Sequence, residues 1–420
     1  TGRLSVVFHR NEALLAHGDH RRDIGEIPYL AGDNDTAVVA WVETRWAGEE
    51  ITYDAKPVLR AELGNFGIVA QFLDANYKPP TPRRRPDGSI PPIVDHPAIA
   101  GLRDLLRQAG VVDNRLAAAT AGTRAAALTR DATLVGLHIR QHTPRRKNGR
   151  KEPNQMVVRI VAIHSTPNVD EFWSVRMYDD TEGWMPYRDA NARYHCGTIG
   201  YEKFGRSGAK AAHVRDYVDQ ALDSLPKQIP LAIFVDAEGA QGLWPGLAHS
   251  RFGSPQLPGS SILHPDLAVV RCASGDRAPR PTHQDHTPRV ADPHKPNLPG
   301  AILYRHQERN VESWLLAQPS RVHRSGAAGR AGTDHTRWTL PAHRERWMPD
   351  DWHALTGTEI SIPRAGGWKT DQLAALTARL CQQAVSWDDR TRLPTPLHLA
   401  KCADDDHPRH QPEGIVAAKE

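Results

Sequence analysis

The pattern of apolar and polar residues divides the chain into two α/β regions. In the first region, short apolar runs predict three strands, at residues 3–9, 36–42 and 68–73. Helical periodicity predicts helices at residues 55–64 and 98–108, and Gly110 follows the second helix as a C-terminal stop residue. Because strands and helices alternate here, we expect a small Rossmann-like α/β layer.

The second region begins after residues 117–129, a run rich in Ala and Thr that we interpret as a linker. The pattern then predicts a meander of three strands at residues 133–141, 155–164 and 172–177. A helix at residues 210–225, which Pro226 ends, and a buried strand at residues 231–235 follow. This order is typical of an RNase H-like fold with a mixed sheet. We therefore expect two domains, spanning residues 1–128 and 129–420.

The rest of the second region contains further elements around a long loop. Residues 276–299 are rich in Pro, His and Asp and have no period, which predicts a surface loop. The remaining strands and the last periodic helix are predicted at residues 301–304, 313–316, 358–362 and 369–385.

Composition narrows the class of protein. The chain has 420 residues, of which 24% are charged and 39% hydrophobic, as in globular proteins of two or three domains. Its apolar runs are far shorter than the roughly 18 residues that cross a bilayer, so we expect a cytoplasmic protein without a membrane partner. The first residue is Thr1 rather than Met, from which we expect a preceding region.

Cysteine spacing and net charge add two limits. The absence of a CxxC pair argues against a zinc site or a disulfide framework. The four cysteines are Cys196, Cys272, Cys381 and Cys402. The formal net charge of +4 permits a polyanionic partner without requiring one.

Two residues at strand positions bear on catalysis. Asp236 follows the apolar strand 231–235, at the carboxyl edge where open parallel sheets bind ligands; alternatively, it only caps the next turn. Nucleases of the RNase H type use carboxylates to hold two metal ions about 4 Å apart. His138 stands in the opening strand where such a fold carries an Asp. An imidazole can bind a metal but supplies no negative charge, so His138 is either a ligand or a structural histidine.

Basic residues concentrate in two predicted loops. Arg83, Arg84 and Arg85 form one cluster, and the predicted hairpin tip at residues 144–151 contains Arg145, Arg146, Lys147, Arg150 and Lys151. Cations that neutralise phosphates release counterions and favour nucleic-acid binding. Each loop is equally compatible with a solvated surface segment.

Several short motifs resemble one family. LPTPLHLAK at residues 393–401 resembles the closing helix of PIWI domains, and together with FVDAEGAQGLWPG at residues 234–246 it is similar to the pPIWI-RE family of bacterial Argonaute relatives. DAKPVLR at residues 54–60 and GIVAQFL at residues 67–73 resemble its MID domain. TEISI at residues 358–362 resembles a late PIWI strand.

The resemblance implies a MID domain that binds the 5′ end of a guide strand and a PIWI domain that holds a guide–target duplex. The phosphate pocket of Argonautes uses a Tyr or Arg, a Lys and a Gln, for which the candidates here are Tyr53, Lys56, Arg60 and Gln71. Lys56 and Arg60 are four residues apart, so a helix presents both on one face. Arg103 and Arg107 are candidates for a further contact, and Arg140, Arg145 and Arg146 for contacts elsewhere.

The resemblance also implies a degenerate nuclease centre. Asp236 matches one Asp of the Argonaute tetrad, His138 replaces another, and Lys401 stands where an Asp or His closes the site. One carboxylate cannot hold two magnesium ions, unless Glu238 or Glu359 is recruited. Any Mg²⁺ or Mn²⁺ would bind at Asp236, and Lys401 would favour phosphate over metal.

Three functions follow from these observations. The leading hypothesis is guide-dependent binding of RNA or DNA in defence against plasmids and phages, alongside a DinG-type helicase and a restriction-endonuclease-like protein, as the family implies. The second is an active metal-dependent endonuclease that uses Asp236 with Glu238 or Glu359. The third is a protein-interaction scaffold.

Overall fold

The computed structural model describes most of the chain, and all structural statements concern that part. It comprises residues 38–44, 56–74, 77–78, 81, 86–90, 95–112, 114–121, 127–142, 155–197, 208–274, 278, 282–284, 302–307, 311–319, 352–381 and 391–408. The predicted strand at residues 3–9 lies outside it, as do Tyr53, Arg145 and Arg146.

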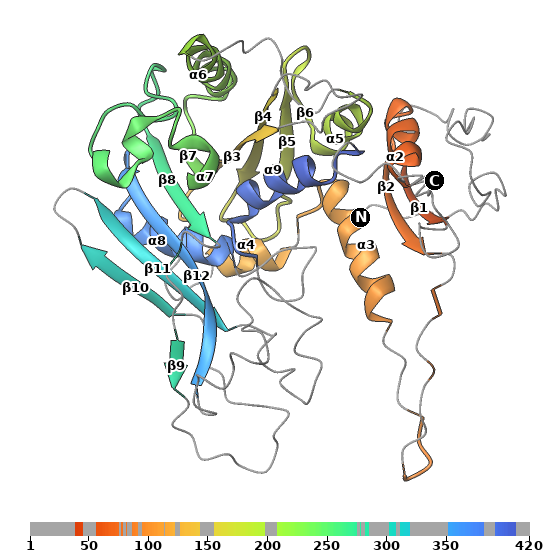
Figure 1. Cartoon of the computed structure of the whole chain (residues 1–420). Coiled ribbons are helices and arrows are strands. Elements are labelled where there is room, and N and C mark those ends of the chain that lie inside the picture. Colours follow the sequence, from red (N-terminus) through yellow and green to blue (C-terminus); the bar gives the residue numbers. More distant parts are fainter. Residues whose placement is uncertain are drawn as a thin grey trace, which may run out of the picture.

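The N-terminal region is a small α/β layer (Figure 1). Strand β1 (Val39–Thr44) lies parallel to β2 (Val69–Asp74), with helices α2 (Lys56–Asn65) and α3 (His96–Gln108) packed on them. Alternate residues of a strand face opposite sides. Phe72 accordingly packs in a core with Leu59 of α2, whereas Trp41 faces Gly101 of α3. This arrangement matches the predicted Rossmann-like layer.

The larger region is built on one mixed sheet of ten strands. Their order is β10-β11-β12-β8-β7-β3-β4-β5-β6, and β9 pairs with β12. The strands β3, β7 and β8 run parallel, and the other pairs are antiparallel. The bounds are β3 Ala132–His142, β4 Gln155–Ser165, β5 Ser174–Asp179, β6 Gly183–Pro186, β7 Leu231–Asp236, β8 Leu267–Ser274, β9 Thr282–Gln284, β10 Ile302–Gln307, β11 Glu312–Pro319 and β12 Trp352–Arg364.

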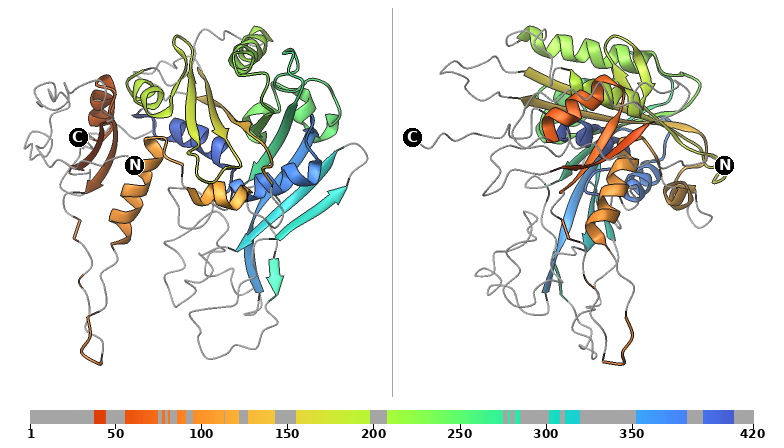
Figure 2. Two further views of the ribbon diagram at one scale, coloured as in Figure 1. Left: turned by 180° about the vertical axis from the view of Figure 1, so that it is seen from behind. Right: turned by 90° about the vertical axis from the view of Figure 1, so that its right-hand side faces the viewer.

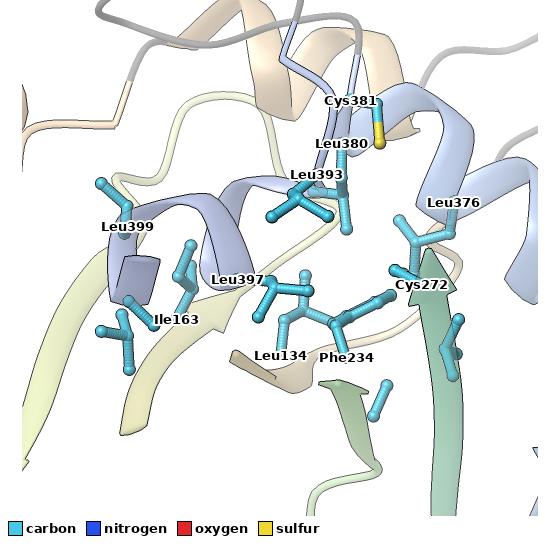
Figure 3. Close-up of a cluster of buried hydrophobic side chains, with 14 of the residues drawn as sticks. Leu134, Ile163, Phe234, Cys272, Leu376, Leu380, Cys381, Leu393, Leu397 and Leu399 are labelled. Atoms are coloured by element: carbon cyan, nitrogen blue, oxygen red, sulfur yellow. The ribbon is translucent and has the colours of Figure 1, made fainter. Parts of the chain in front are cut away.

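Helices cover both faces of this sheet, as the views in Figure 2 show. One face packs against α4 (Asn114–Ala121), α5 (Tyr187–Cys196), α8 (Thr370–Leu380) and α9 (Thr395–Asp405). Figure 3 shows its core, in which Leu134, Phe234 and Leu397 are completely buried. The other face packs against α6 (Gly208–Asp223), the short α7 (Ala237–Ala240) and the 3-10 turn η2 (Pro245–Leu247), which the 3-10 turn η3 (His249–Arg251) follows.

The first turn of α9 lies directly on the backbone of β3. A Cβ atom added to Gly136 would stand 2.2 Å from the carbonyl carbon and oxygen of Pro396. Such distances are far below van der Waals contact, so only glycine fits this position of the strand. The glycine thereby brings α9 close enough for its later residues to reach the centre of the sheet.

Several elements differ from the sequence prediction. Residues 117–121 of the expected linker belong to α4 (Asn114–Ala121), because Leu116 and Ala117 are buried in the core beside α8. The short strand β9 occurs within the expected surface loop at residues 276–299. Strand β12 begins at Trp352, six residues before the predicted strand. Within the described ranges, no helix is long and apolar enough to cross a bilayer.

Candidate nucleic-acid interface

Three side chains meet on the α9 face of the large sheet. His138 lies on β3, Asp236 ends β7, and Asp404 comes from the last turn of α9. His138 Nε2 lies 3.1 Å from Asp404 Oδ2, and its Nδ1 lies 3.7 Å from Asp236 Oδ2. In the parallel register of β3 and β7, Leu137 lies opposite Val235, so the next residues, His138 and Asp236, lie side by side on the same face of the sheet. We call these three residues the central cluster.

Asp404 is the most heavily bonded member of the central cluster. It is fully buried, and its carboxylate accepts hydrogen bonds from Arg140 Nε at 2.6 Å and Arg140 Nη2 at 2.8 Å. Tyr194 of α5 donates a further bond from its hydroxyl at 3.3 Å. A buried carboxylate needs such partners, and a bidentate guanidinium is among the strongest of them. Asp404 therefore ties α9 to β3 and α5.

The central cluster favours the protonated imidazole. Burial lowers the pKa of His138, but Asp236 and Asp404 outweigh burial and raise that pKa above its ordinary value. Burial raises the pKa of Asp236, and His138, the Glu238 backbone N–H and the Lys401 charge together lower it. The two carboxylates thus favour the imidazolium over the neutral ring.

His138 should make stability depend on pH in a defined direction. Because its folded pKa is raised, the protonated ring stabilises the fold fully below its ordinary pKa of 6.5, and this contribution is lost as pH rises through the folded pKa. We expect the difference in unfolding free energy between the wild type and His138→Asn to be largest below pH 6.5 and to shrink in alkaline solution. Urea unfolding across this pH range measures it. A difference that grows with pH would contradict the assignment.

The central cluster does not fit a pair of divalent metals. Both carboxylate oxygens of Asp404 accept hydrogen bonds from Arg140, and the His138 ring stands between the two acids. Metal ions at such centres need several carboxylate oxygens that are not neutralised by protein cations. Among the described residues, no group of three or more His, Cys, Asp or Glu is placed to hold a metal ion.

The structure changes the expected membership of this centre. Two carboxylates are present rather than one, because Asp404, three residues after Lys401, reaches His138. Lys401 does not close the site: it pairs instead with Asp405, with Nζ 2.7 Å from Oδ2. That partner outweighs burial and raises the pKa of Lys401.

The two glutamates named as possible recruits are not brought to Asp236 as ligands. Glu238 is exposed on α7, and its backbone N–H donates to Asp236 Oδ1 at 3.0 Å. Glu359 lies on β12 opposite Ala273 and accepts a hydrogen bond from Arg271 Nη1 at 2.8 Å. Since its neighbour Ile360 packs on the α9 side, Glu359 faces the other side of the sheet from Asp236.

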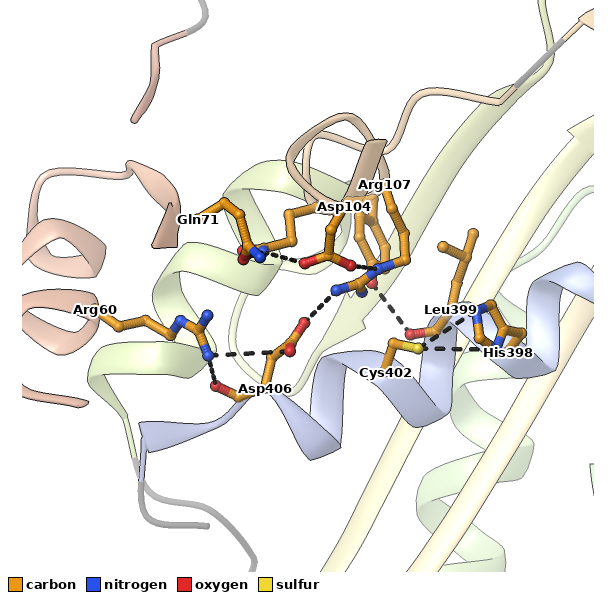
Figure 4. Close-up of polar contacts among 10 residues, drawn as sticks. Arg60, Gln71, Asp104, Arg107, His398, Leu399, Cys402 and Asp406 are labelled. Atoms are coloured by element: carbon orange, nitrogen blue, oxygen red, sulfur yellow. Dashed lines mark hydrogen bonds and ion pairs between the residues drawn. The ribbon is translucent and has the colours of Figure 1, made fainter. Parts of the chain in front are cut away.

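A second group of polar residues lies where the small α/β layer meets the large sheet (Figure 4). Arg107 of α3 contacts Asp406 Oδ2 at 2.5 Å and Asp104 Oδ1 at 2.7 Å. Arg60 of α2 donates from Nη1 to the Asp406 carbonyl oxygen at 2.7 Å and lies 3.9 Å from its carboxylate. Gln108 donates to Gln71 at 3.2 Å and to Asp104 at 3.0 Å. These six residues form the boundary cluster: Arg60, Gln71, Asp104, Arg107, Gln108 and Asp406.

The boundary cluster gathers several of the predicted phosphate ligands around one anion. Burial raises the pKa of Asp406, but Arg107, Arg60 and the Lys56 charge together hold it below its ordinary value. The carboxylate therefore stays ionised between two buried guanidinium groups. Arg103 lies half-buried on the same helix as Arg107.

Sequence reasoning missed Asp404 and Asp406, although a signal was present. Residues 404–406 are three consecutive aspartates at the end of a predicted helix. The C-terminal end of a helix carries partial negative charge, so acids there are unfavourable unless nearby cations compensate them. Such a run therefore indicates that the helix end meets basic residues.

Comparison with protein-family models identifies two consecutive domains in the chain. A family model described as the RNaseH domain of pPIWI_RE matches residues 134–409, and one described as the MID domain of pPIWI_RE matches residues 2–117. The chain belongs to the pPIWI-RE family. In this pPIWI-RE protein the boundary cluster joins the two matched domains, since Arg60 and Arg107 come from the MID domain and Asp406 from the RNase H-like domain.

Solved structures of two Argonautes and of a Piwi protein are similar at low identity. Kluyveromyces polysporus Argonaute with a guide RNA is 10% identical, with a TM-score of 0.44 over 88% of this chain and 37% of that one. The C-terminal lobe of a budding yeast Argonaute is 10% identical (TM-score 0.42; 88% and 62%), and Drosophila Piwi is 12% identical (0.31; 67% and 31%). The pPIWI-RE chain thus spans less than two thirds of each. No curated protein matches its sequence.

Family membership establishes the domain architecture of the protein. A MID domain followed by an RNase H-like domain is an Argonaute-like architecture, which supports nucleic-acid binding. The matched ranges leave residues 118–133 between them. Our boundary at residues 128 and 129 lies within this interval and stays a prediction.

Proposed function

We propose that this pPIWI-RE protein binds a guide strand by its 5′-phosphate at the boundary cluster and uses it to pair with a target. The observation that carries the proposal is the convergence of Arg60 and Arg107 from two MID helices on a single half-buried anion position, with Lys56 adding charge. Guanidinium groups bind phosphate through the same paired donors that they offer a carboxylate. The cluster therefore has the donor set that a terminal phosphate requires.

The same proposal holds that the protein does not cleave the target by itself. In the central cluster His138 and Arg140 provide positive charge where a nuclease of this fold would hold metal ions. We accordingly assign neither Mg²⁺ nor Mn²⁺ to Asp236. Arg140 and Lys401 then serve the structure or the nucleic-acid backbone rather than metal chemistry.

The biological setting is part of the proposal. By its family resemblance, the protein acts in the cytoplasm in defence against plasmids and phages, together with a DinG-type helicase and a restriction-endonuclease-like protein. A partner nuclease would supply the cleavage that the central cluster does not support. The guide is RNA or DNA, and strands of both kinds belong in the test.

Binding of short labelled strands tests the function directly. We expect the wild type to bind a 5′-phosphorylated strand at least about tenfold more tightly than the same strand with a 5′-hydroxyl, with affinity falling steeply as salt rises. Arg107→Gln should remove most of this preference. Arg305→Gln makes the same charge change at an exposed pair with Glu312 and should retain it. Equal affinity of the wild type for both strands would rule out the proposal.

A cleavage assay on the same complexes separates the nuclease alternative. The wild type is incubated with guide, complementary target and manganese, and no product is expected. A product that disappears in Asp236→Asn would instead support a metal-dependent endonuclease.

A further inference from the structure

The anion held by the boundary cluster belongs to the chain itself. Asp406 caps the C-terminal end of α9, and its side chain is 21% exposed between Arg60 and Arg107. It thus lies where the proposed function requires the terminal phosphate of a guide strand. The guanidinium groups cannot make the same contacts with both anions at once.

The boundary also offers more donors than a carboxylate uses. Arg107 Nη1 is buried without a hydrogen-bond partner among the described residues, and so are the side-chain nitrogens of Asn191 and His195 on α5. Asn191 and His195 are four residues apart and share one helix face. Burial lowers the pKa of His195 most, and the nearby charges of Arg60 and Arg107 lower it further. Buried donors without partners are costly. A phosphate monoester has three terminal oxygens and up to two negative charges, so it can satisfy groups that Asp406 leaves unpaired.

The MID and RNase H-like domains pack closely enough to make α5 part of this site. A Cβ atom on Gly64 of α2 would lie 2.6 Å from the Ala192 carbonyl oxygen of α5. The helix that carries Asn191 and His195 is therefore in direct backbone contact with the helix that carries Arg60. Buried side-chain nitrogens of α5, in the RNase H-like domain, therefore lie beside the MID helix that carries Arg60.

We propose that Asp406 occupies the terminal-phosphate position in the guide-free protein and that the 5′-phosphate of an incoming strand displaces it. This inference rests on the proposed function. Release opens the last turn of α9, which breaks the bond from the Asp406 N–H to the Cys402 carbonyl oxygen at 2.9 Å and the bond from Arg60 to the Asp406 carbonyl oxygen. The contact of the His407 ring with Tyr194, at 4.5 Å between centroids, also holds this turn closed. Asp406 acts as a built-in competitor: a phosphorylated end must displace it and a hydroxyl end need not, so it weakens the binding of phosphorylated strands in particular.

Removing the competing charge tests the inference. Asp406→Asn keeps the size of the side chain and one acceptor oxygen, and it should increase the preference for a 5′-phosphate over a 5′-hydroxyl strand by about tenfold. Asp405→Asn is the matched control, because it removes the neighbouring charge, which lies exposed beside Lys401, and it should leave the preference unchanged. An unchanged or smaller preference in Asp406→Asn overturns the inference. If the wild type shows no preference at all, the proposed function itself fails.

A measurement on the wild type avoids any folding defect of the variant. Hydrogen exchange of the backbone amides at residues 401–408 is measured in two complexes, one saturated with a 5′-phosphorylated strand and one saturated with the same strand carrying a 5′-hydroxyl. We expect faster exchange of this segment only with the phosphorylated strand, because displacement opens the last turn of α9. Equal or slower exchange with the phosphorylated strand overturns the inference even if that strand binds more tightly.

Discussion

Replacing Asp404 by alanine should destabilise the folded protein by about 3–5 kcal/mol, because it leaves buried cationic partners without their anion. Asp404 is completely buried and joins Arg140, His138 and Tyr194, which lie on two other elements. Asp404→Asn should cost less, since the amide oxygen still accepts one of these bonds. Urea unfolding followed by circular dichroism measures the effect.

Asp405→Ala provides the matched control for this substitution. Asp405 is the next residue along the same helix, its side chain is 53% exposed, and it forms an i,i+4 pair with Lys401. Exposed pairs of this kind contribute about 0.3–0.5 kcal/mol. Equal destabilisation by the two alanine variants would show that the central cluster does not hold α9 to the sheet.

Gly136→Ala is expected to destabilise the fold by about 3 kcal/mol or more, which lies at the upper end of the cost of overpacking. The added methyl group would stand 2.2 Å from the Pro396 carbonyl group and 2.4 Å from the Leu397 nitrogen. These are backbone atoms, so no side-chain rotation can relieve the clash.

Gly242→Ala tests whether loss of glycine alone has this effect. Gly242 follows α7, and a Cβ atom there meets no heavy atom within 4 Å. Thermal unfolding should show a large loss of stability for Gly136→Ala and little change for Gly242→Ala. If the two variants unfold alike, α9 does not rest on β3 as described.

Much of the fold could be predicted from the sequence because its strands are strongly apolar. The buried strand predicted at residues 231–235 is observed as β7, and the helix predicted at residues 55–64 as α2. Helix α5 was not predicted, since its sequence YRDANARYHC lacks an apolar period. Tertiary contacts of Tyr187 and Ala190 stabilise it instead. Strand β8 was also not predicted, although it begins with the apolar run LAVV.

The candidate site was predicted in part. Arg60, Arg107 and Asp236 were expected at functional positions, and the structure gathers each of them into one of the two clusters. Their partners Asp404 and Asp406 depend on how the last turn of α9 is placed against β3 and the MID domain. Such placement follows from contacts between residues about 260 to 350 positions apart, which no local pattern encodes.

The close seat of Pro396 on Gly136 fixes one end of α9 as a pivot. The helix begins at Thr395 and ends at Asp405, and its first turn is held against β3. Its last turn carries Asp404, which contacts the RNase H-like domain, and is followed by Asp406, which contacts the MID domain. Sliding of the whole helix would force backbone against backbone. A pull on Asp406 is therefore taken up as a tilt or unwinding of the far end, and the next side chain it disturbs is the one that neutralises His138.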